Sequence, residues 1–476
     1  MPSLSANGWF MYCTAATDED GSRMTRARRP GSVGPGFPDQ TGRELTAQQP
    51  VSRALLVGLA SSNRERWVRA DSLDELGALT RTAGGEVVEK LVQVRDRIDP
   101  ALYFGRGFAR RLGELCFEAA VNLVIVDEPL SPTQQRNLER EVGVRVIDRS
   151  ALILDIFAVH ARTAEARLQV ELAQLEYRQS RLVGTREELS RLGGGIGTRG
   201  PGETQLEVDR RRIRQRITAL RRGLEKVARE RAVQCRGRSH LPRVALVGYT
   251  NAGKSTLFNR LARARVLVSD RLFATLDANT RPWQIADHIR LLLTDTVGFI
   301  RHLPHELIAS FRATLAEVRD ADLLLHLADA TNPRLDATID VVHDTLEEVG
   351  ASGVHRQLVF TKTDGLFDDA GRARLERLYS GAVFLSALTG EGIEDLKREL
   401  VERIESGMIA CRFSLPAERQ DLVHRVRRSG RVLSEAGSGG RVQLTMLGFP
   451  EDIGRVRSQL VGFVGVRVSD RPLPGP

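Results

Sequence analysis

The 476-residue sequence predicts a multidomain α/β protein. Three observations predict this class. Short apolar runs alternate with helix-length segments over 51–158 and again over 239–406, a pattern typical of α/β domains with a mostly parallel sheet. Apolar residues at coiled-coil spacing fill 159–238 and predict an antiparallel helical hairpin between those domains. The last stretch, 407–476, has the pattern of a helix followed by strand, turn, helix and strand, which predicts a small αβ domain.

Composition excludes several classes of protein. A hydrophobic fraction of 41% and a charged fraction of 28% are ordinary for a soluble globular chain. No run approaches about eighteen apolar residues, so a membrane-spanning helix is excluded. The 4 cysteines lack C-x-x-C spacing, which argues against a zinc site or a disulfide framework and fits a reducing compartment.

Residues 1–50 are rich in Gly, Pro, Ser and Arg without an amphipathic period, and predict a disordered N-terminal extension. The extension has no apolar core of a secretory signal, and its acidic cluster argues against a mitochondrial presequence. We therefore expect a cytoplasmic protein. The formal net charge of +9 permits a polyanionic partner such as RNA, because cationic side chains neutralise phosphates. A basic surface without such a partner is an equally good interpretation of composition alone.

In the first α/β stretch, "RALLVGL" (53–59) and "VNLVIVD" (121–127) predict buried strands. The segment "SPTQQRNLEREVG" predicts a helix with Ser131 as its N-cap and Pro132 in its first turn. This stretch holds no recognisable catalytic constellation.

The hairpin is predicted as helices over 160–191 and 203–232, joined by the glycine-rich tip "RLGGGIGTRGPGETQLE" (191–207). Apolar residues of the second helix are spaced by four and three residues, as in a coiled-coil seam: Ile213, Ile217, Leu220, Leu224 and Val227. The same helix is rich in arginine, and its candidate RNA contacts are Arg210, Arg211 and Arg214. A solvated charged face is the alternative interpretation of these arginines.

The stretch "GYTNAGKST" (248–256) matches the P-loop pattern and lies between an apolar strand and a helix, as that motif requires. Its glycines let successive backbone N–H groups point at phosphate oxygens, and the helix N-terminus favours negative charge. Lys254 is predicted to reach the β- and γ-phosphates, and Ser255 to ligate Mg²⁺. The predicted nucleotide contacts of this loop are Gly248, Tyr249, Thr250, Asn251, Ala252, Gly253, Lys254 and Ser255.

Selectivity for guanine is predicted from "LVFTKTD" (358–364), which resembles the Asn-Lys-x-Asp motif of GTPases. Asp364 can accept hydrogen bonds from two donors on guanine that adenine lacks. Thr361 replaces the Asn of the motif; its hydroxyl can tie this loop to the P-loop, but a contact to the base N7 is in doubt. A fifth GTPase motif is matched by "FLSAL" (384–388). The predicted base contacts are Thr361, Lys362, Thr363, Asp364, Ser386, Ala387 and Leu388.

The segment "IRLLLTDTVGF" (289–299) is a predicted buried strand that runs into a D-x-x-G motif. Asp295 is predicted to lie behind the Mg²⁺ ligands, and the backbone N–H of Gly298 to contact the γ-phosphate. Thr275, in "LFATLDANTR", is predicted to be the second protein ligand of Mg²⁺ beside Ser255, and to release on hydrolysis. The predicted catalytic residues are Lys254, Thr275 and Gly298. The remaining predicted contacts are Phe273, Ala274, Leu276, Asp277, Thr296 and Val297.

Phe299 follows the D-x-x-G motif, where many GTPases have a glutamine that orients the attacking water. A phenyl ring has no group for this task. We therefore expect slow intrinsic hydrolysis that a partner accelerates, or a water held by another residue.

Together these motifs make the chain similar to GTPases of the HflX family. The resemblance is carried by "GGGIGTRGPGETQLE", the segment 148–177, "GYTNAGKSTLFN", "LFATLD" and "DTVGFIRHLPHELIASFRATL" (295–315), and it spans about 51–405. It implies a P-loop GTPase domain that converts GTP to GDP and phosphate with Mg²⁺. It also implies a monomeric factor that binds the large (50S) ribosomal subunit and splits or rescues stalled ribosomes under stress, with hydrolysis stimulated by the ribosome.

The resemblance further implies that the hairpin contacts rRNA near the peptidyl-transferase centre. Glycines at the tip would let the backbone approach RNA closely, and an arginine would meet phosphates or bases. The candidate RNA contacts at the tip are Gly193, Gly194, Gly195, Gly197, Arg199 and Gly200. The main alternative is a regulatory GTPase switch that acts on a protein or membrane partner without the ribosome, so peripheral membrane association stays open. A third reading, tRNA modification, lacks a substrate-modifying constellation.

Overall fold

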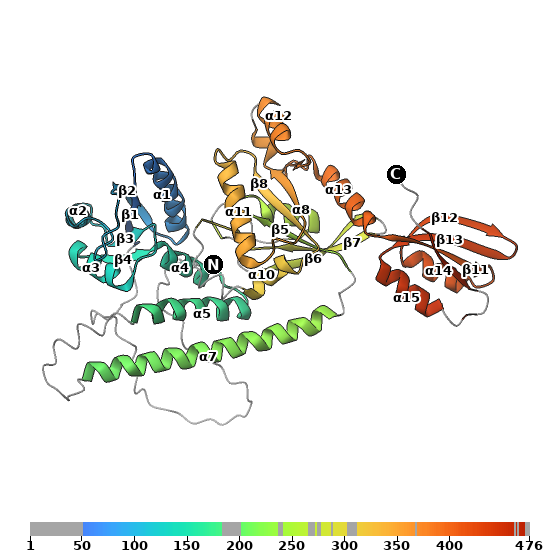
Figure 1. Cartoon of the computed structure of the whole chain (residues 1–476), viewed down its shortest axis with the longest axis horizontal. Coiled ribbons are helices and arrows are strands. Elements are labelled where there is room, and N and C mark those ends of the chain that lie inside the picture. Colours follow the sequence, from blue (N-terminus) through green and yellow to red (C-terminus); the bar gives the residue numbers. More distant parts are fainter. Residues whose placement is uncertain are drawn as a thin grey trace, which may run out of the picture. The chain divides into compact units, whose positions relative to one another are not determined.

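A computed structural model of the chain describes most of the residues after 50 (Figure 1). The described residues are 51–182, 201–236, 241–264, 272–273, 278–286, 289–301, 312–366, 369–460, 463 and 466–471. They form two compact units, the first from 1–159 and 180–203, and the second from 160–179 and 204–476. The predicted extension, 1–50, and the glycine-rich tip lie outside the described residues.

The first unit is built on a parallel four-stranded sheet with the order β2-β1-β3-β4. Its strands are β1 (Arg53–Ala60), β2 (Glu86–Val94), β3 (Leu123–Val126) and β4 (Arg145–Asp148), and its helices are α1 (Glu65–Thr82), α2 (Arg106–Glu118), α3 (Pro132–Val142) and α4 (Arg149–His160). The start of α3 is as predicted. Ser131 accepts a hydrogen bond from the backbone N–H of Gln134, and the Gln134 side chain accepts one in return.

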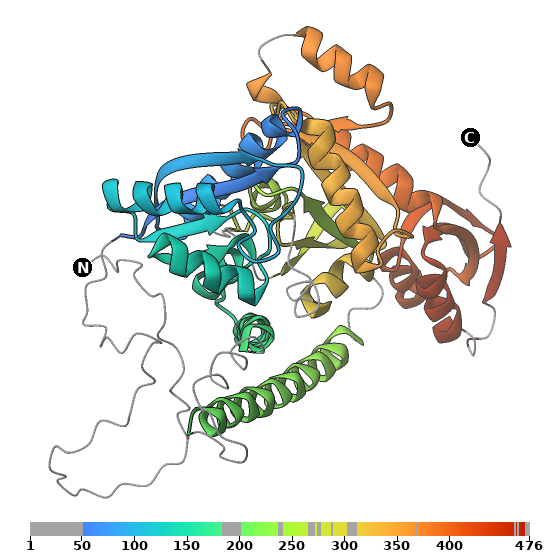
Figure 2. The ribbon, with the colours of Figure 1, turned by 60° about the vertical axis from the view of Figure 1, so that its left-hand side comes forward.

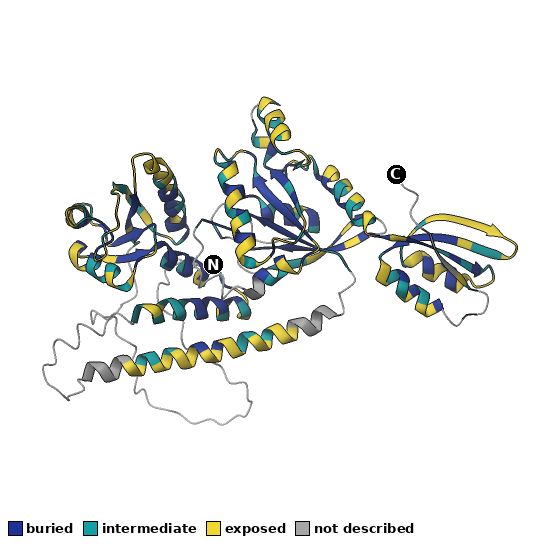
Figure 3. Ribbon diagram, in the orientation of Figure 1, coloured by how far each residue is buried: buried dark blue, intermediate teal, exposed yellow. Residues whose placement is uncertain are grey.

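The hairpin helices are α5 (Ala164–Arg181) and α7 (Pro201–Arg236). The last part of the first predicted helix, 183–191, lies outside the described residues, and the second helix is longer than predicted at both ends and includes 201–207 of the glycine-rich segment. Their contact is apolar at its centre, where Leu172, Ile217 and Leu220 are buried. Most of α7 away from this contact is exposed (Figure 3), because one helix covers only one side of its surface.

The second unit contains a six-stranded sheet with the order β10-β9-β8-β5-β7-β6, parallel except for β6. Its strands are β5 (Arg243–Gly248), β6 (Asn279–Ala286), β7 (Ile289–Asp295), β8 (Leu323–Asp329), β9 (Arg356–Thr361) and β10 (Val383–Phe384). Its helices are α8 (Lys254–Ala262), α10 (Arg312–Arg319), α11 (Leu335–Val349), α12 (Asp369–Leu378), α13 (Ile393–Ser406) and the short 3₁₀ helix η2 (Thr363–Gly365).

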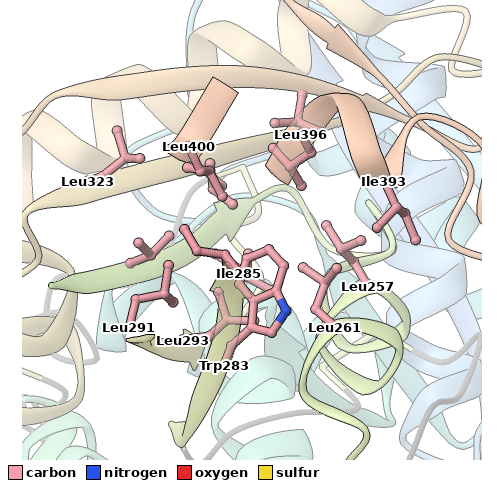
Figure 4. Packing of buried hydrophobic residues seen from close by; sticks show 14 of the residues in the cluster. Leu257, Leu261, Trp283, Ile285, Leu291, Leu293, Leu323, Ile393, Leu396 and Leu400 are labelled. Atoms are coloured by element: carbon pink, nitrogen blue, oxygen red, sulfur yellow. The ribbon is translucent and has the colours of Figure 1, made fainter. Parts of the chain in front are cut away.

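A large apolar cluster on one side of this sheet fixes the helix that begins at the P-loop (Figure 4). Leu257 and Leu261 of α8 pack with Trp283 of β6 and Leu293 of β7, while Leu396 of α13 closes the cluster. Since α8 is anchored by its apolar side, its N-terminus is held at the carboxyl edge of the sheet, where ligands bind in open α/β folds.

The last part of the second unit has the strand and helix order β-α-β-β-α-β. Its elements are β11 (Ile409–Pro416), α14 (Gln420–Arg428), β12 (Arg431–Ser438), β13 (Arg441–Gly448), α15 (Pro450–Leu460) and β14 (Arg467–Arg471). The sheet is antiparallel with the order β12-β13-β11-β14, a ferredoxin-like arrangement. The sequence pattern predicted α14, β13, α15 and β14 but not β11 and β12.

Within the described residues, no helix is long and apolar enough to cross a membrane. Cys116 and Cys411 are buried free thiols.

Candidate nucleotide site

The P-loop connects β5 to α8, and its glycines are required by close contacts. A β carbon on Gly248 would lie 2.4 Å from the carbonyl oxygen of Leu327 in the neighbouring strand β8, so no larger residue fits there. Gly253 has a φ of 79° immediately before α8, a conformation that glycine adopts without strain. The strand therefore turns sharply into the helix, and the first backbone N–H groups of α8 are left facing outward.

Lys254 is the first residue of α8 and is buried within the loop. Its Nζ donates hydrogen bonds to the carbonyl oxygens of Gly248, at 3.0 Å, and Tyr249, at 2.7 Å. Burial lowers the pKa of Lys254 to about 8, and the neighbouring Asp295 carboxylate opposes that shift. The ammonium group of Lys254 is therefore held among backbone carbonyl oxygens. A further negatively charged group beside Asp295 would stabilise its charge.

Ser255 and Asp295 face each other across the loop. The Ser255 hydroxyl donates to Oδ2 of Asp295 at 2.8 Å, and Asp295 is fully buried at the end of β7. The hydroxyl of Thr296 donates to the carbonyl oxygen of Leu246 and joins the end of β7 to β5. Gly298 approaches the loop so closely that a β carbon there would lie 3.0 Å from Nζ of Lys254.

Phe299 is a structural residue. Its ring is 1% exposed, and its backbone exchanges hydrogen bonds with the P-loop: Thr250 N–H donates to the Phe299 carbonyl at 2.8 Å, and Phe299 N–H donates to the Gly248 carbonyl at 3.1 Å. The Tyr249 hydroxyl accepts a hydrogen bond from the N–H of Arg301. The D-x-x-G segment is thus paired with the P-loop like a short piece of sheet, and the phenyl ring is buried.

Thr361 ends β9 and is fully buried. Its hydroxyl lies 2.9 Å from the carbonyl oxygen of Ala252 in the P-loop and 3.2 Å from that of Ala328. This contact confirms that the threonine hydroxyl ties the two loops together, as the sequence suggested for the residue in place of Asn.

The loop after Thr361 presents its charged residues outward. Lys362 has a φ of 56°, and its Nζ forms an ion pair with Oδ2 of Asp329 at 2.7 Å. Asp364 lies in η2 with an exposed side chain. Thr363 is buried, and its backbone N–H donates to Leu385, which joins this loop to the next one.

The segment after β10 forms the last wall of the site. Ser386 is buried and its hydroxyl accepts a hydrogen bond from Thr389 N–H, while Leu388 is exposed. The Arg260 guanidinium, from α8, donates to the carbonyl oxygens of Leu388, at 3.2 Å, and Thr389, at 3.1 Å. The helix that follows the P-loop therefore also holds the loop that contains Ser386 and Ala387.

The structure brings the P-loop, Asp295, Gly298 and Thr361 together around the start of α8. Phe273 is buried, but Ala274, Thr275, Leu276 and Asp277 lie outside the described residues, as do the tip candidates Gly193, Gly194, Gly195, Gly197, Arg199 and Gly200. Sequence reasoning missed Arg260 and Asp329. Asp329 carried a signal, since it ends a buried strand beside β5, but Arg260 carried none.

A parallel sheet with a strand–glycine loop–helix turn, a buried lysine at the helix start and a serine–aspartate pair beside it defines a P-loop GTPase. Models of three protein families match the chain: "GTP-binding GTPase N-terminal" at 70–158, "GTP-binding GTPase Middle Region" at 160–238 and "50S ribosome-binding GTPase" at 243–362.

The similar relatives include the GTPase HflX of Lacrimispora saccharolytica, which is 44% identical over 80% of this chain and 90% of its own length. The GTPase HflX of Escherichia coli (strain K12) is 47% identical over 73% of this chain and 82% of its own length. A solved GTP-binding protein of the archaeon Sulfolobus solfataricus, in complex with GDP, is 25% identical over 74% of this chain and 98% of its own, with a TM-score of 0.38. The chain belongs to the HflX family, and it is a GTPase.

Proposed function

We propose that this GTPase acts on the large ribosomal subunit, that the subunit stimulates its hydrolysis of GTP, and that the cycle splits or rescues stalled ribosomes under stress. The observation that carries the proposal is the match of residues 243–362 to the 50S ribosome-binding GTPase model. That range includes the P-loop, Asp295 and Thr361, and it ends two residues before Asp364. Phe299 adds support, because a buried ring cannot orient water and a partner would then be needed for fast hydrolysis.

At the nucleotide we assign the following roles. Lys254 neutralises the β- and γ-phosphates, the backbone N–H of Gly298 contacts the γ-phosphate, and Asp364 selects guanine. Ser255 and Thr275 would hold Mg²⁺, with Asp295 accepting hydrogen bonds behind them. The Ser255 hydroxyl, 2.8 Å from a buried carboxylate, fits this ion because Mg²⁺ prefers oxygen ligands. When bound, Mg²⁺ neutralises charge that develops on the phosphates.

The hairpin supports an RNA partner through the charges on α7. Arg216 and Arg221 form ion pairs with Glu171 and Glu176 of α5, at 2.6 and 2.8 Å, and so stabilise the hairpin itself. Arg211 and Arg222 are exposed. They are eleven residues apart, about three helical turns, and therefore lie on one side of α7, away from the apolar seam.

The exposed arginines of α7 are suited to phosphate contacts, and Arg214 flanks them. We therefore propose that this side of the hairpin, with the tip, contacts rRNA near the peptidyl-transferase centre, and that the factor works as a cytoplasmic monomer.

The test compares GTP turnover of the full chain with and without purified 50S subunits, together with co-sedimentation at increasing salt. The variant R211Q/R222Q should keep basal turnover and lose most of the stimulation, and its co-sedimentation should fall off at lower salt. The charge-matched control R374Q/R377Q, on exposed residues of α12, should behave as wild type.

Equal turnover with and without 50S subunits, and no co-sedimentation at low salt, would refute the ribosome as partner and leave the regulatory switch on a protein or membrane. Equal losses in both variants would show that only total charge matters and would remove α7 from the contact.

A further inference from the structure

Helices α14 and α15 cover one face of the sheet of the ferredoxin-like part (Figures 1 and 2), and on the opposite face only one end is covered, where Ala410 and Leu447 pack in the apolar cluster with α13. Side chains of α14 and α15 pack on Cys411, Phe413 and Leu415 of β11 and on Leu444 and Met446 of β13. Because side chains alternate along a strand, the residues between these point to the opposite face. Beyond the buried Ala410, Leu447 and Thr445, this open face includes Arg412, Ser414, Pro416, Arg431, Ser434, Ala436, Ser438, Arg441, Gln443 and Arg467.

Three arginines of the open face surround Ser414. Arg467 lies directly opposite Ser414 in the pairing of β11 with β14, and Arg412 is two residues along the same strand. The guanidinium of Arg441 donates to the hydroxyl of Ser414, at 2.8 Å, and to its carbonyl oxygen, at 2.9 Å. Neighbouring strands are about 5 Å apart and alternate residues about 7 Å apart, so these three cations share a small area.

Among the described residues, the four strands contribute no carboxylate to the open face, and Arg412 and Arg467 form no ion pair. The fourth arginine, Arg431, pairs with Glu405 at the edge of the sheet. Glu435 of β12 points to the helical face, where it pairs with Arg427 of α14. Arg412 and Arg467 therefore produce a local positive potential beside Ser414 that an external anion can satisfy.

The chemistry of the face favours a nucleic acid strand over a membrane. Guanidinium groups bind phosphate oxygens in bidentate geometry, and the Ser434 hydroxyl and the Gln443 amide add hydrogen-bond donors. Leu433, at the bulge of β12, is an exposed apolar side chain beside this face, but a single such residue does not form the apolar surface that enters a bilayer. No described residue of the face offers an aromatic platform for base stacking, so contacts to RNA would be made to the backbone and not to base identity.

The size of the face favours a single strand. Strand β11 has 8 residues, so the face is about 27 Å long. A double-stranded RNA-binding domain contacts about 16 base pairs, which is a longer stretch than this face can cover. We propose that the open face of the ferredoxin-like part binds single-stranded RNA through its phosphates, with no sequence preference. This surface goes beyond the nucleotide site and hairpin discussed above, and it does not depend on stimulation by the ribosome.

The experiment measures binding of a fluorescent single-stranded RNA of mixed sequence to the full chain by anisotropy, over a series of salt concentrations. All proteins carry R210Q/R211Q/R214Q, so that the hairpin cannot mask the C-terminal contribution. Adding R412Q/R467Q should weaken binding about fivefold or more at 0.1 M salt. Since each phosphate contact to a single strand contributes about 0.7 to the slope of log K against log salt, the slope should flatten by about 1.4.

The matched control adds R425Q/R428Q, which removes the same charge from exposed residues of α14 on the helical face. It should leave affinity and slope unchanged, and both variants should keep the urea midpoint and GTP affinity of their parent. Equal losses in both variants, or no loss with R412Q/R467Q, would overturn the proposal.

The same variants are also tested for binding to vesicles that contain anionic phospholipid. If R412Q/R467Q lost vesicle binding and kept RNA binding, the face would be a membrane contact and the proposal would be wrong. Turnover with 50S subunits is measured separately, so a failed ribosome proposal and a failed RNA face give different results.

Discussion

Two sheet edges of this molecule carry charged residues at equivalent places and use them differently. In both units, charged side chains follow the carboxyl ends of parallel strands. In the second unit these are Lys254 and Asp295, beside a glycine loop that leaves backbone N–H groups uncovered. In the first unit they are Asp127, Asp148 and Arg149, which follow or end β3 and β4.

In the first unit the charges satisfy one another. Arg149 is 1% exposed, and its guanidinium forms ion pairs with Asp127 and Glu75, both at 2.9 Å. Arg181 pairs with Asp148 at 2.6 Å, and burial raises the pKa of Glu128 to about 7, although the Arg69 guanidinium opposes that shift. This edge is filled by a structural charge network.

The difference teaches that a charged carboxyl edge is not by itself a ligand site. The sheet of the first unit has the order β2-β1-β3-β4, with a switch point between β1 and β3 where such folds bind ligands. The P-loop adds a glycine turn and an open helix N-terminus, whereas the first unit places a buried arginine there.

The largest expected effect comes from breaking the network of the first unit. Arg149→Met removes the cation that pairs with the buried Asp127 and the half-buried Glu75 and leaves Asp127 only the more distant Arg69, at 3.8 Å, which costs about 3 kcal/mol of folding free energy. Hydrogen exchange of β1 and β3, measured by mass spectrometry, should accelerate strongly. Arg149→Lys, which keeps the charge, should have a smaller effect, and both variants should bind GTP as wild type. Unchanged exchange in Arg149→Met would mean that the network is not structural.

A change at the other edge should alter the ligand and not the stability. Asp364 is exposed, so Asp364→Asn removes no buried contact. Affinity for GTP should fall about 100-fold, and affinity for xanthosine triphosphate should rise, because the amide can donate to the xanthine oxygen. Asp344→Asn, an exposed carboxylate of α11, is the control. Equal GTP affinity in wild type and Asp364→Asn, measured by calorimetry, would show that the base lies elsewhere.

The sequence predicted those parts of the site whose requirements are local. The P-loop is recognisable because glycine at two positions, lysine and serine are each needed within nine residues. Arg260 was missed because its partners, Leu388 and Thr389, lie 128 and 129 residues away, and no local pattern marks such a contact. The role of Thr361 could be predicted in part, because its neighbours resembled a known motif. Its hydroxyl does reach the P-loop.

The fold likewise contains elements that the local sequence predicted and elements that it did not. Strands β1, β3, β5 and β7 are buried apolar runs, and the sequence predicted them. Strand β12 was missed because it is an exposed edge strand whose polar sequence, "RVLSEAGS", has no clear alternation. Its pairing with β13, and not its composition, makes it a strand. The positive open face was therefore invisible until the pairing of the strands was known.

The smallest expected effect tests whether Lys254 can still gain stabilisation from a phosphate, in contrast to Arg149, which forms ion pairs with Asp127 and Glu75. Its pKa is lowered to about 8 by burial, and phosphate binding would raise it, so GTP binds with uptake of a proton above that pH. Affinity should be constant below about pH 7.5 and fall about fourfold between pH 6.5 and 8.5.

Lys254→Arg is the control for this titration, because an arginine stays charged over the whole range; whatever its affinity, its pH profile should be flat. A wild-type profile as flat as that of the variant would mean that Lys254 is already fully stabilised by Asp295 and the loop carbonyls. The two sheet edges would then differ in their loops, whereas the charges of Lys254 and Arg149 would be equally well compensated by the protein.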